Sequence, residues 1–240
     1  MSPYATTTTQ YLSGGQTRVT DPANAIVTTT SRAFGDPNAA EPMTIVDAMG
    51  ATTIMMRNIH GNVTQLDQSG STPVAASVTR KFWYDNELRL CRHRAPEFGD
   101  EVFLYDAQGL LTQSGRGEAP ATVCATSIGT GIRVTRSYDA IHRETSIAFP
   151  AGTPGITRTY DGNGNVTNVT RTGGAVWDYT YTAIDGLATE QLVIDGRTYF
   201  IGHAYNGNGD PTMRSNSHSG VTVDFSANAY GQPRQASVGA

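Results

Sequence analysis

A short motif that recurs along the chain constrains the fold more than any other feature of the sequence. The motif is a tyrosine followed by an aspartate, with glycine at the fifth position. Its clearest copies begin at Tyr84, Tyr105, Tyr138 and Tyr160, and weaker copies begin at Ser31, Arg57, Tyr181, Tyr205 and Ala227. The usual spacing of about 22 residues is that of a small supersecondary unit. The sequence therefore predicts a tandem repeat array.

The second and fifth positions of the motif hold residues typical of a hairpin turn. An Asp or Asn at the first corner of a type I turn accepts backbone N–H groups, and a Gly at the fourth corner adopts a left-handed bulge conformation. We therefore expect turn caps at the second position, namely Asp85, Asp106, Asp139, Asp161, Asn206 and Asn228. We expect bulge glycines at the fifth position, among them Gly35, Gly109, Gly164, Gly209 and Gly231, whereas Gly186 comes one residue late.

Alternating stretches flank each turn, as in residues 156–160 and 166–170, so each copy is expected to contain two antiparallel strands. The composition agrees, because 26 Gly, 11 Tyr and only 16% charged residues favour strands and turns. Nine copies give about eighteen strands, and a flat sheet of that size would be ~85 Å wide, beyond the ~10 strands at which open sheets curl. The predicted fold class is all-β, with tandem hairpins forming one long, curved, spirally wound antiparallel sheet, shell-like or barrel-like.

The repeat pattern extends along nearly the whole chain. Residues 1–15 are rich in Thr, Ser and Gly and are expected to form a frayed lead-in. The array is expected to occupy residues 16–240, with no internal domain boundary. The first thirty residues show no intact motif, and the segments around Asp21 and Asp47 are typical of the second turns that join successive hairpins.

The stretches YDAQGLLTQ, YDGNGNVTNVT and YNGNGDPTMR resemble the YD repeats of the Rhs family, and RAPEFGDEVFLYD resembles that family's Pro-Glu-x-Gly turn before the Tyr-Asp strand. This family includes polymorphic bacterial toxins, the cocoon-forming components of Tc toxin complexes, and the teneurins. The resemblance covers about residues 20–240. It implies a β-sheet wound into a hollow shell, which in toxin members encloses a C-terminal effector domain. The sequence lacks the DPxGL-type motif at which such shells cleave themselves, and its repeats run to the last residues, so neither self-cleavage nor an internal toxin domain is expected.

Charge and hydropathy exclude several classes of partner. The formal net charge is −4, and no cluster of Lys or Arg indicates binding to nucleic acid. The first ten residues lack an apolar signal region, and no stretch approaches the roughly 18 apolar residues of a membrane span. We expect a soluble chain that is secreted or located at the cell surface, with any export signal outside this sequence.

The two cysteines, Cys91 and Cys124, lie in different repeats and lack metal-type spacing. Free, half-buried thiols are the favoured interpretation, and a disulfide is the alternative.

No catalytic set emerges from the sequence. The repeated aspartates could form a carboxylate row or calcium ladder, but their places at turn corners favour backbone capping. The DGNGN stretch at Asp161 lacks a downstream EF-hand Glu, and the five His residues have no paired spacing. We therefore expect no enzyme activity, no metal and no cofactor.

The repeated tyrosines should stack on one face of the sheet, where packing alone accounts for them. The alternative is a carbohydrate-binding platform, formed by Tyr138, Tyr160, Tyr181 and Tyr205. The sequence thus predicts a structural segment of an Rhs-type shell that encloses or presents a partner or toxin domain encoded elsewhere. The second hypothesis is an extracellular adhesion or carbohydrate-binding module. Expected partners are the rest of a larger Rhs-type chain, further copies bound through sheet edges, or a glycan.

Overall fold

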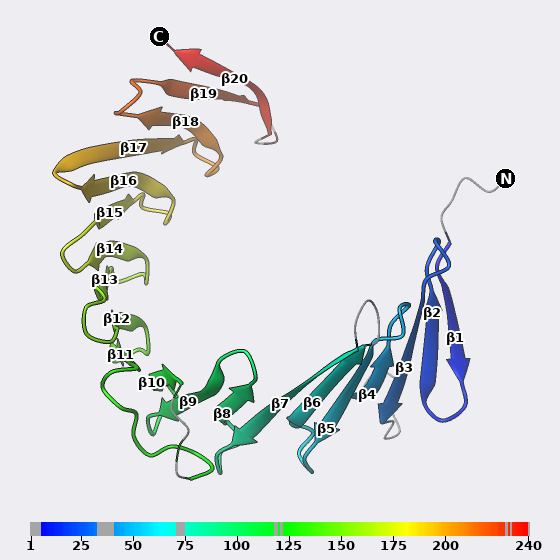
Figure 1. The fold of residues 1–240 in the computed structure, drawn as a ribbon. Helices are drawn as coiled ribbons and strands as arrows, with labels where there is room; N and C mark the ends of the chain where they lie inside the picture. Colours follow the sequence, from blue (N-terminus) through cyan, green and yellow to red (C-terminus); the bar gives the residue numbers. More distant parts are fainter. Residues whose placement is uncertain are drawn as a thin grey trace. The chain divides into compact units, whose positions relative to one another are not determined.

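The computed structural model describes residues 6–32, 41–70, 75–117, 120, 122–228, 230 and 232–239. These residues form twenty strands joined by turns, and no helix occurs among them. From β1 to β9 and from β11 to β20, each strand pairs antiparallel with the next strand in the chain. The predicted all-β fold of tandem antiparallel hairpins is therefore confirmed (Figure 1).

The chain divides into two compact units, where the sequence indicated no boundary. Unit 1 comprises residues 1–104 and 114–129, and unit 2 comprises residues 105–113 and 130–240. The described residues between Arg116 and Arg133 contain no strand, so the regular succession of hairpins stops there. This irregular segment lengthens the spacing between the copies that begin at Tyr105 and Tyr138. The predicted winding of the whole array stays a prediction.

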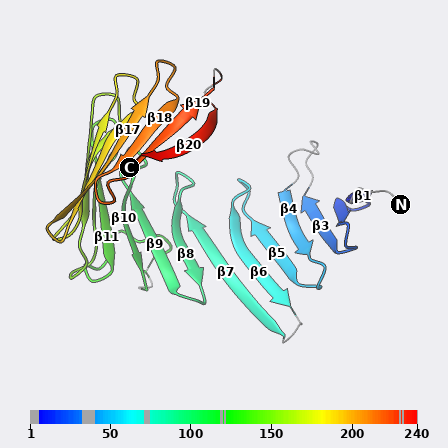
Figure 2. The same cartoon turned by 90° about the horizontal axis from the view of Figure 1, so that it is seen from above.

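Unit 1 is built from the first nine strands, and Figure 2 shows the hairpins from β3 to β8 side by side in chain order. The strands are β1 (Thr8–Leu12), β2 (Gln16–Thr20), β3 (Ile26–Arg32), β4 (Glu41–Val46), β5 (Thr52–Arg57), β6 (Val63–Gly70), β7 (Ala76–Tyr84), β8 (Leu90–Ala95) and β9 (Gly99–Tyr105). The next strand, β10 (Leu111–Arg116), contributes residues to both units.

Unit 2 continues the same architecture. Its strands are β11 (Arg133–Tyr138), β12 (Glu144–Ala148), β13 (Ile156–Tyr160), β14 (Val166–Arg171), β15 (Val176–Tyr181), β16 (Leu187–Ile194), β17 (Arg197–Tyr205), β18 (Pro211–Asn216), β19 (Thr222–Ala227) and β20 (Pro233–Gly239). Each odd-numbered strand from β5 to β19 ends at the first residue of a motif copy. The register shifts just before that residue, for example between Thr159 and Tyr160, which is the mark of a β-bulge.

The N-terminal residues are more regular than the sequence indicated. Strand β1 lies inside the segment that we expected to be a frayed lead-in, and it pairs with β2 along its whole length. The turn from Asp21 to Asn24 is also intact, because Asn24 N–H donates to the Asp21 carbonyl and Asn24 is left-handed, with φ of 64°. Asn tolerates that conformation better than most residues, so it replaces the expected glycine.

The sheet has very little core. Eight side chains are buried among the described residues, and seven of them lie in β8, β9, β10 and the segment that follows β10. The eighth is Ala175, in the turn before β15. Ordinary domains bury the face of one layer against a second layer. Most of this chain is instead a single layer of hairpins with partly exposed side chains on both faces.

Candidate functional site

The repeat turn is the structural unit on which the array depends, and the Asp161 turn shows its geometry. Gly164 N–H donates to the Asp161 carbonyl at 3.2 Å, and Asp161 N–H donates to the Asn165 carbonyl at 2.9 Å. Asp161 Oδ1 accepts the backbone N–H groups of Asn163 and Asn165 at 3.0 and 2.8 Å. This side chain therefore satisfies two donors that the bulge leaves without strand partners.

All six residues that the sequence marks as caps occupy this position. Each side chain accepts two backbone N–H groups, two and four residues further on, at 2.8 to 3.0 Å; the caps are Asp85, Asp106, Asp139, Asp161, Asn206 and Asn228. Asp21 and Asp47, which the sequence assigned to joining turns, make the same pair of bonds.

Hydrogen bonds at the cap lower the pKa of two of these carboxyl groups, Asp139 and Asp85. The backbone N–H of Arg143 is the main cause that holds the pKa of Asp139 below its usual range, and the Arg143 guanidinium adds to it. Burial acts to raise the pKa of Asp85, but hydrogen bonds from Arg89 and Glu87 outweigh it and lower that pKa. Both carboxylates are therefore held in the charged, accepting form that a cap requires.

The fifth position of the motif is left-handed in every copy where the structure gives its φ angle. Gly109, Gly164 and Gly209 have φ of 85°, 96° and 86°. Where the copy has no glycine, Leu88, His142 and Asp185 adopt the same conformation, at 62°, 68° and 60°. Gly35 and Gly231 lie outside the described residues.

Gly186, one residue after the left-handed position, is required for a different reason. A Cβ atom at this residue would lie 3.3 Å from the ring of Tyr205 in the next hairpin and 3.1 Å from Thr182 Oγ1. Close approach of the next tyrosine therefore explains this glycine.

The motif tyrosines join each hairpin to the one before it. In five copies the tyrosine hydroxyl donates to a backbone carbonyl of the preceding hairpin at 2.6 to 3.0 Å, always to the residue five positions after that hairpin's turn cap position. The five pairs are Tyr84–Val63, Tyr138–Leu111, Tyr160–Glu144, Tyr181–Val166 and Tyr205–Leu187. We call this bond the tyrosine staple. Burial raises the pKa of Tyr84, Tyr138 and Tyr181, so their hydroxyls stay protonated and able to donate.

An arginine takes over the staple in the second copy. Arg57 occupies the tyrosine position, and its Nη2 donates to the Pro42 carbonyl at 3.4 Å. Pro42 pairs with Ser31 across the bulge of the first copy, as Val166 pairs with Tyr160 in a later one. The bond therefore reaches the equivalent carbonyl. The sequence shows that Arg57 stands in the tyrosine position, but it does not indicate that an arginine can make the same bond.

The strand register separates the two faces of unit 2, which the alternating sequence alone left mixed. One face, the threonine face, carries a row of directly paired small residues: Ser137, Ser146, Thr157, Thr170, Val176, Val193 and Thr198. The opposite face, the tyrosine face, carries the staples and the paired row Arg158, Val169, Trp177, Leu192 and Tyr199. Tyr138, Tyr160, Tyr181 and Tyr205 thus share one face, with hydroxyls engaged in staples. The carbohydrate platform on them stays a prediction.

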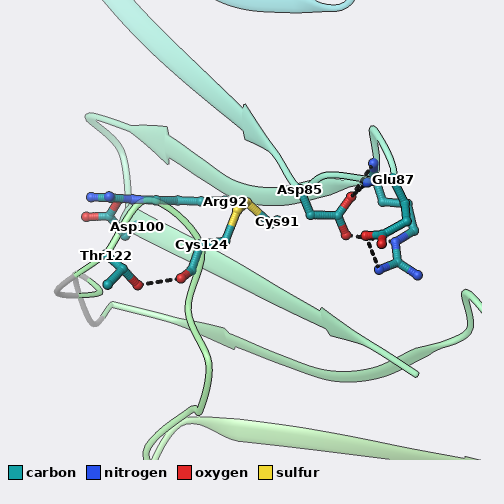
Figure 3. Close-up of a disulfide and its surroundings, with 8 residues drawn as sticks. Asp85, Glu87, Cys91, Arg92, Asp100, Thr122 and Cys124 are labelled. Carbon is teal, nitrogen blue, oxygen red and sulfur yellow. Dashed lines mark hydrogen bonds and ion pairs between the residues drawn. A yellow bond between two sulfur atoms is a disulfide. The ribbon is translucent and has the colours of Figure 1, made fainter. Parts of the chain in front are cut away.

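Unit 1 contains a disulfide beside its few buried side chains. Cys91 in β8 is bonded to Cys124, and their Cα atoms are 5.3 Å apart (Figure 3). Cys91 and Ala95 are buried on one face of β8, and Ile128 is buried in the segment that carries Cys124. The buried Val102 pairs with Arg92 and therefore lies on the opposite face. The interpretation as free thiols was therefore wrong. Pairing of the cysteines depends on how the irregular segment after β10 returns to β8, and the local sequence does not specify that path.

An ion-pair network lies beside the disulfide. Asp100 is only 5% exposed and accepts Arg92 Nε at 2.6 Å and Arg94 Nη2 at 2.8 Å. Burial acts to raise the pKa of Asp100, yet the two arginines outweigh it and lower that pKa. The Arg92 guanidinium also lies 4.5 Å from the ring centroid of Trp83. Asp100 in β9 thus pairs with two arginines of β8 across the two strands.

The described residues contain no group of three or more His, Cys, Asp or Glu side chains placed to hold a metal ion. An open hollow of about 340 Å³ lies between two successive turns of unit 2, lined by Asp106, Arg136, Tyr138, Asp139 and His142 among others. Its aspartates are the turn caps described above. The described part of the chain also contains no helix long and apolar enough to cross a membrane.

Comparison with known proteins gives a match in structure only. No protein-family model matches the sequence, and no curated protein sequence matches it. The chain resembles a crystal structure of TcdB2-TccC3-TEV with a TM-score of 0.54 at 13% identity, over 97% of this chain and 15% of that chain. A crystal structure of TcdB2-TccC3 gives a TM-score of 0.48 at 12% identity, over 97% of this chain and 13% of that chain. A Photorhabdus luminescens Tc holotoxin pore gives 0.45 at 13% identity, over 97% of this chain and 16% of that chain.

The first of these matches shows that the chain shares its fold with part of TcdB2-TccC3-TEV. The likeness extends to the fold alone, because the identity is low and this chain spans about 15% of the length of the matched one.

Proposed function

We propose that this chain is a non-catalytic structural segment of a YD-type shell, which encloses or presents a partner or toxin domain encoded elsewhere. The observation that carries the proposal is the single layer of stapled hairpins, which has almost no buried side chains outside β8 to β10 and the segment that follows β10. We call this single layer of paired hairpins the wall, because a sheet of this kind can separate an interior space from solvent. The fold that it shares with part of TcdB2-TccC3-TEV supports this role.

The partners follow from the same geometry. A wall made of paired strands extends by adding strands at its edges, so the natural partners are the rest of a larger chain or further copies of this one. The disulfide supports a secreted or cell-surface location, because structural disulfides persist in oxidising compartments.

The test is the mass and shape of the protein in solution over a dilution series. Light scattering coupled to size exclusion gives the mass, and negative-stain images of the same fractions give the shape. We expect rings, filaments or closed particles that dissociate on dilution. A compact monomer at every concentration would contradict the proposal and direct the work toward glycan screening.

A further inference from the structure

The segment after β10 is tied to the sheet by one covalent bond and little else. We call residues 122–128 the clasp segment. Its Cys124 is bonded to Cys91 across a sequence separation of 33 residues, and its Ile128 is buried. Within the described part of the chain, the backbone of the clasp segment makes no hydrogen bond to a strand. Its attachment therefore rests on the disulfide and on one apolar side chain.

The strand side of the attachment is much firmer. Cys91 lies in β8 and is only 2% exposed. The next residue, Arg92, forms the buried pair with Asp100 and covers Trp83, and β8 pairs with both β7 and β9. These contacts do not involve the disulfide. β8 should therefore keep its place when the bond opens.

The two cysteine residues also differ in exposure. Cys124 is half-buried, and its neighbour Val123 is 56% exposed. Because thiol–disulfide exchange requires a thiolate to approach one sulfur along the S–S axis, the attack is directed to Cys124 Sγ, with Cys91 as the leaving group.

We propose that the Cys91–Cys124 disulfide is a redox-sensitive clasp, closed in an oxidising compartment and opened by a dithiol reductant in a reducing one. One thiolate of the dithiol bonds to Cys124 Sγ, and the Cys91 sulfur leaves as a thiolate that takes up a proton. The second thiol of the dithiol then displaces Cys124, which also leaves as a thiol. The dithiol becomes a disulfide, having supplied two electrons and two protons. The clasp segment is released, while β8 stays paired. This inference does not rest on the proposed function.

The experiment compares the oxidised protein with protein reduced by dithiothreitol under native conditions and then desalted. A short pulse of N-ethylmaleimide followed by mass spectrometry measures the labelling of each thiol. We expect Cys124 to label at least roughly tenfold faster than Cys91, because only Cys124 leaves the sheet. A parallel thermolysin digest should cleave the Ser127–Ile128 bond at least roughly tenfold faster after reduction, because Ile128 loses its cover.

The Cys91→Ser/Cys124→Ser double variant is the matched control. It should show the fast cleavage at Ile128 with or without dithiothreitol, which excludes an effect of the reagent itself. Slow labelling of Cys124 together with an intact Ser127–Ile128 bond in the reduced protein would overturn the proposal, because the segment would then be held without the disulfide. Equal, fast labelling of both thiols would also overturn it, because β8 would then have unfolded as well. Neither result bears on the mass in solution, which tests the proposed function separately.

Discussion

At the scale of single residues, the fifth position of the repeat requires a left-handed backbone conformation. Leu88 occupies this position in its copy, although a leucine is strained there. Its φ is 62°, and its side chain is 45% exposed, so little packing offsets the strain. A left-handed conformation costs an L-residue about 1 to 2 kcal/mol. We expect Leu88→Gly to stabilise unit 1 by about 0.5 to 1 kcal/mol, since the flexibility of glycine in the unfolded chain cancels part of the gain.

Urea denaturation followed by Trp83 fluorescence, in a Trp177→Phe background, measures this effect. Leu88→Ala is the control, because alanine keeps the left-handed strain and should not stabilise the protein. An equal gain from both substitutions would show that the leucine side chain, and not its backbone, was unfavourable.

The tyrosine staple makes a second prediction at this scale. Tyr160→Phe removes the hydroxyl that donates to Glu144 but keeps the ring on which the Arg143 guanidinium lies. The Glu144 carbonyl then loses a partner in a partly buried place, which costs about 1 kcal/mol. Urea denaturation followed by Trp177 should show this loss. Tyr199→Phe, in a ring that packs on His218, should change the stability by less than half as much. Equal losses of unfolding free energy in Tyr160→Phe and Tyr199→Phe would show that the staple bond does not stabilise the fold.

His93 predicts how unit 1 responds to acid. Its ring stacks on Phe82 with centroids 4.7 Å apart and meets the edge of Phe98, and its Nε2 is buried without a hydrogen bond. Burial lowers the pKa of His93, while Glu101 opposes this effect and Arg80 and Arg116 add to it. The unfolded chain therefore binds the proton more readily than the fold does. His93 thus favours the fold above its unfolded pKa of about 6.5, and that contribution falls as the pH drops below it.

We expect the unfolding free energy of unit 1 to be smaller at about pH 5.5 than at about pH 7.5. His93→Phe keeps the stacking and should remove this difference. Carboxylates with lowered pKa, such as Asp85 and Asp100, lose their stabilising effect only at more acid pH, below about 4. An unchanged loss in the variant between the two pH values would contradict the assignment to His93.

At the scale of elements, the sequence predicted hairpins well because each turn is a local device. A cap, a bulge and a tyrosine occur within five residues, so the ends of the odd-numbered strands from β5 to β19 could be predicted from the motif. Substitutions with the same physical effect were harder to see. Asn24 takes the left-handed position that glycine usually occupies, and Arg57 makes the bond that tyrosine makes in other copies. Neither side chain is chemically similar to the residue whose place it takes. The disulfide could not be predicted, because it depends on an irregular path over a separation of 33 residues.

The disulfide is the one element whose removal should weaken unit 1 as a whole. For a separation of 33 residues, the loss of loop-closure restraint in the unfolded chain corresponds to between about 3 and 4 kcal/mol. Because the clasp segment is also released in the reduced fold, we expect the Cys91→Ser/Cys124→Ser variant to lose only part of this, between about 1 and 3 kcal/mol of unfolding free energy, in the Trp83 transition. The Trp177 transition, in unit 2, is the internal control and should not move. A loss below about 1 kcal/mol would indicate that the reduced chain keeps the same restraint.

At the scale of the whole molecule, a single-layer wall should unfold differently from a globular domain. A globular protein of 240 residues has a heat capacity change of unfolding of roughly 3 kcal/mol/K. Because few side chains here are buried, we expect a clearly smaller value by calorimetry. The two compact units should also give separate urea transitions at Trp83 and Trp177. A full-sized heat capacity change with coincident transitions would contradict the single-layer description.

Under the proposed function, the chain associates through the edge strands of its sheet. Strand β1 is the outermost strand of unit 1 in Figure 1, and every one of its residues is exposed, with Tyr11 84% exposed. Natural proteins block such edges with charged residues, especially lysine. Tyr11→Lys should therefore weaken self-association at least roughly tenfold in a light-scattering dilution series, while β1 keeps its pairing with β2.

Tyr230→Lys is the matched control, because Tyr230 is 88% exposed but lies in a turn. The two substitutions make the same change in charge and lose the same ring, so only the position on an edge strand distinguishes them. An equal effect of both would assign the association to apolar contact or net charge. A selective effect of Tyr11→Lys would show that the wall grows by adding strands, which is how a shell segment must join its neighbours.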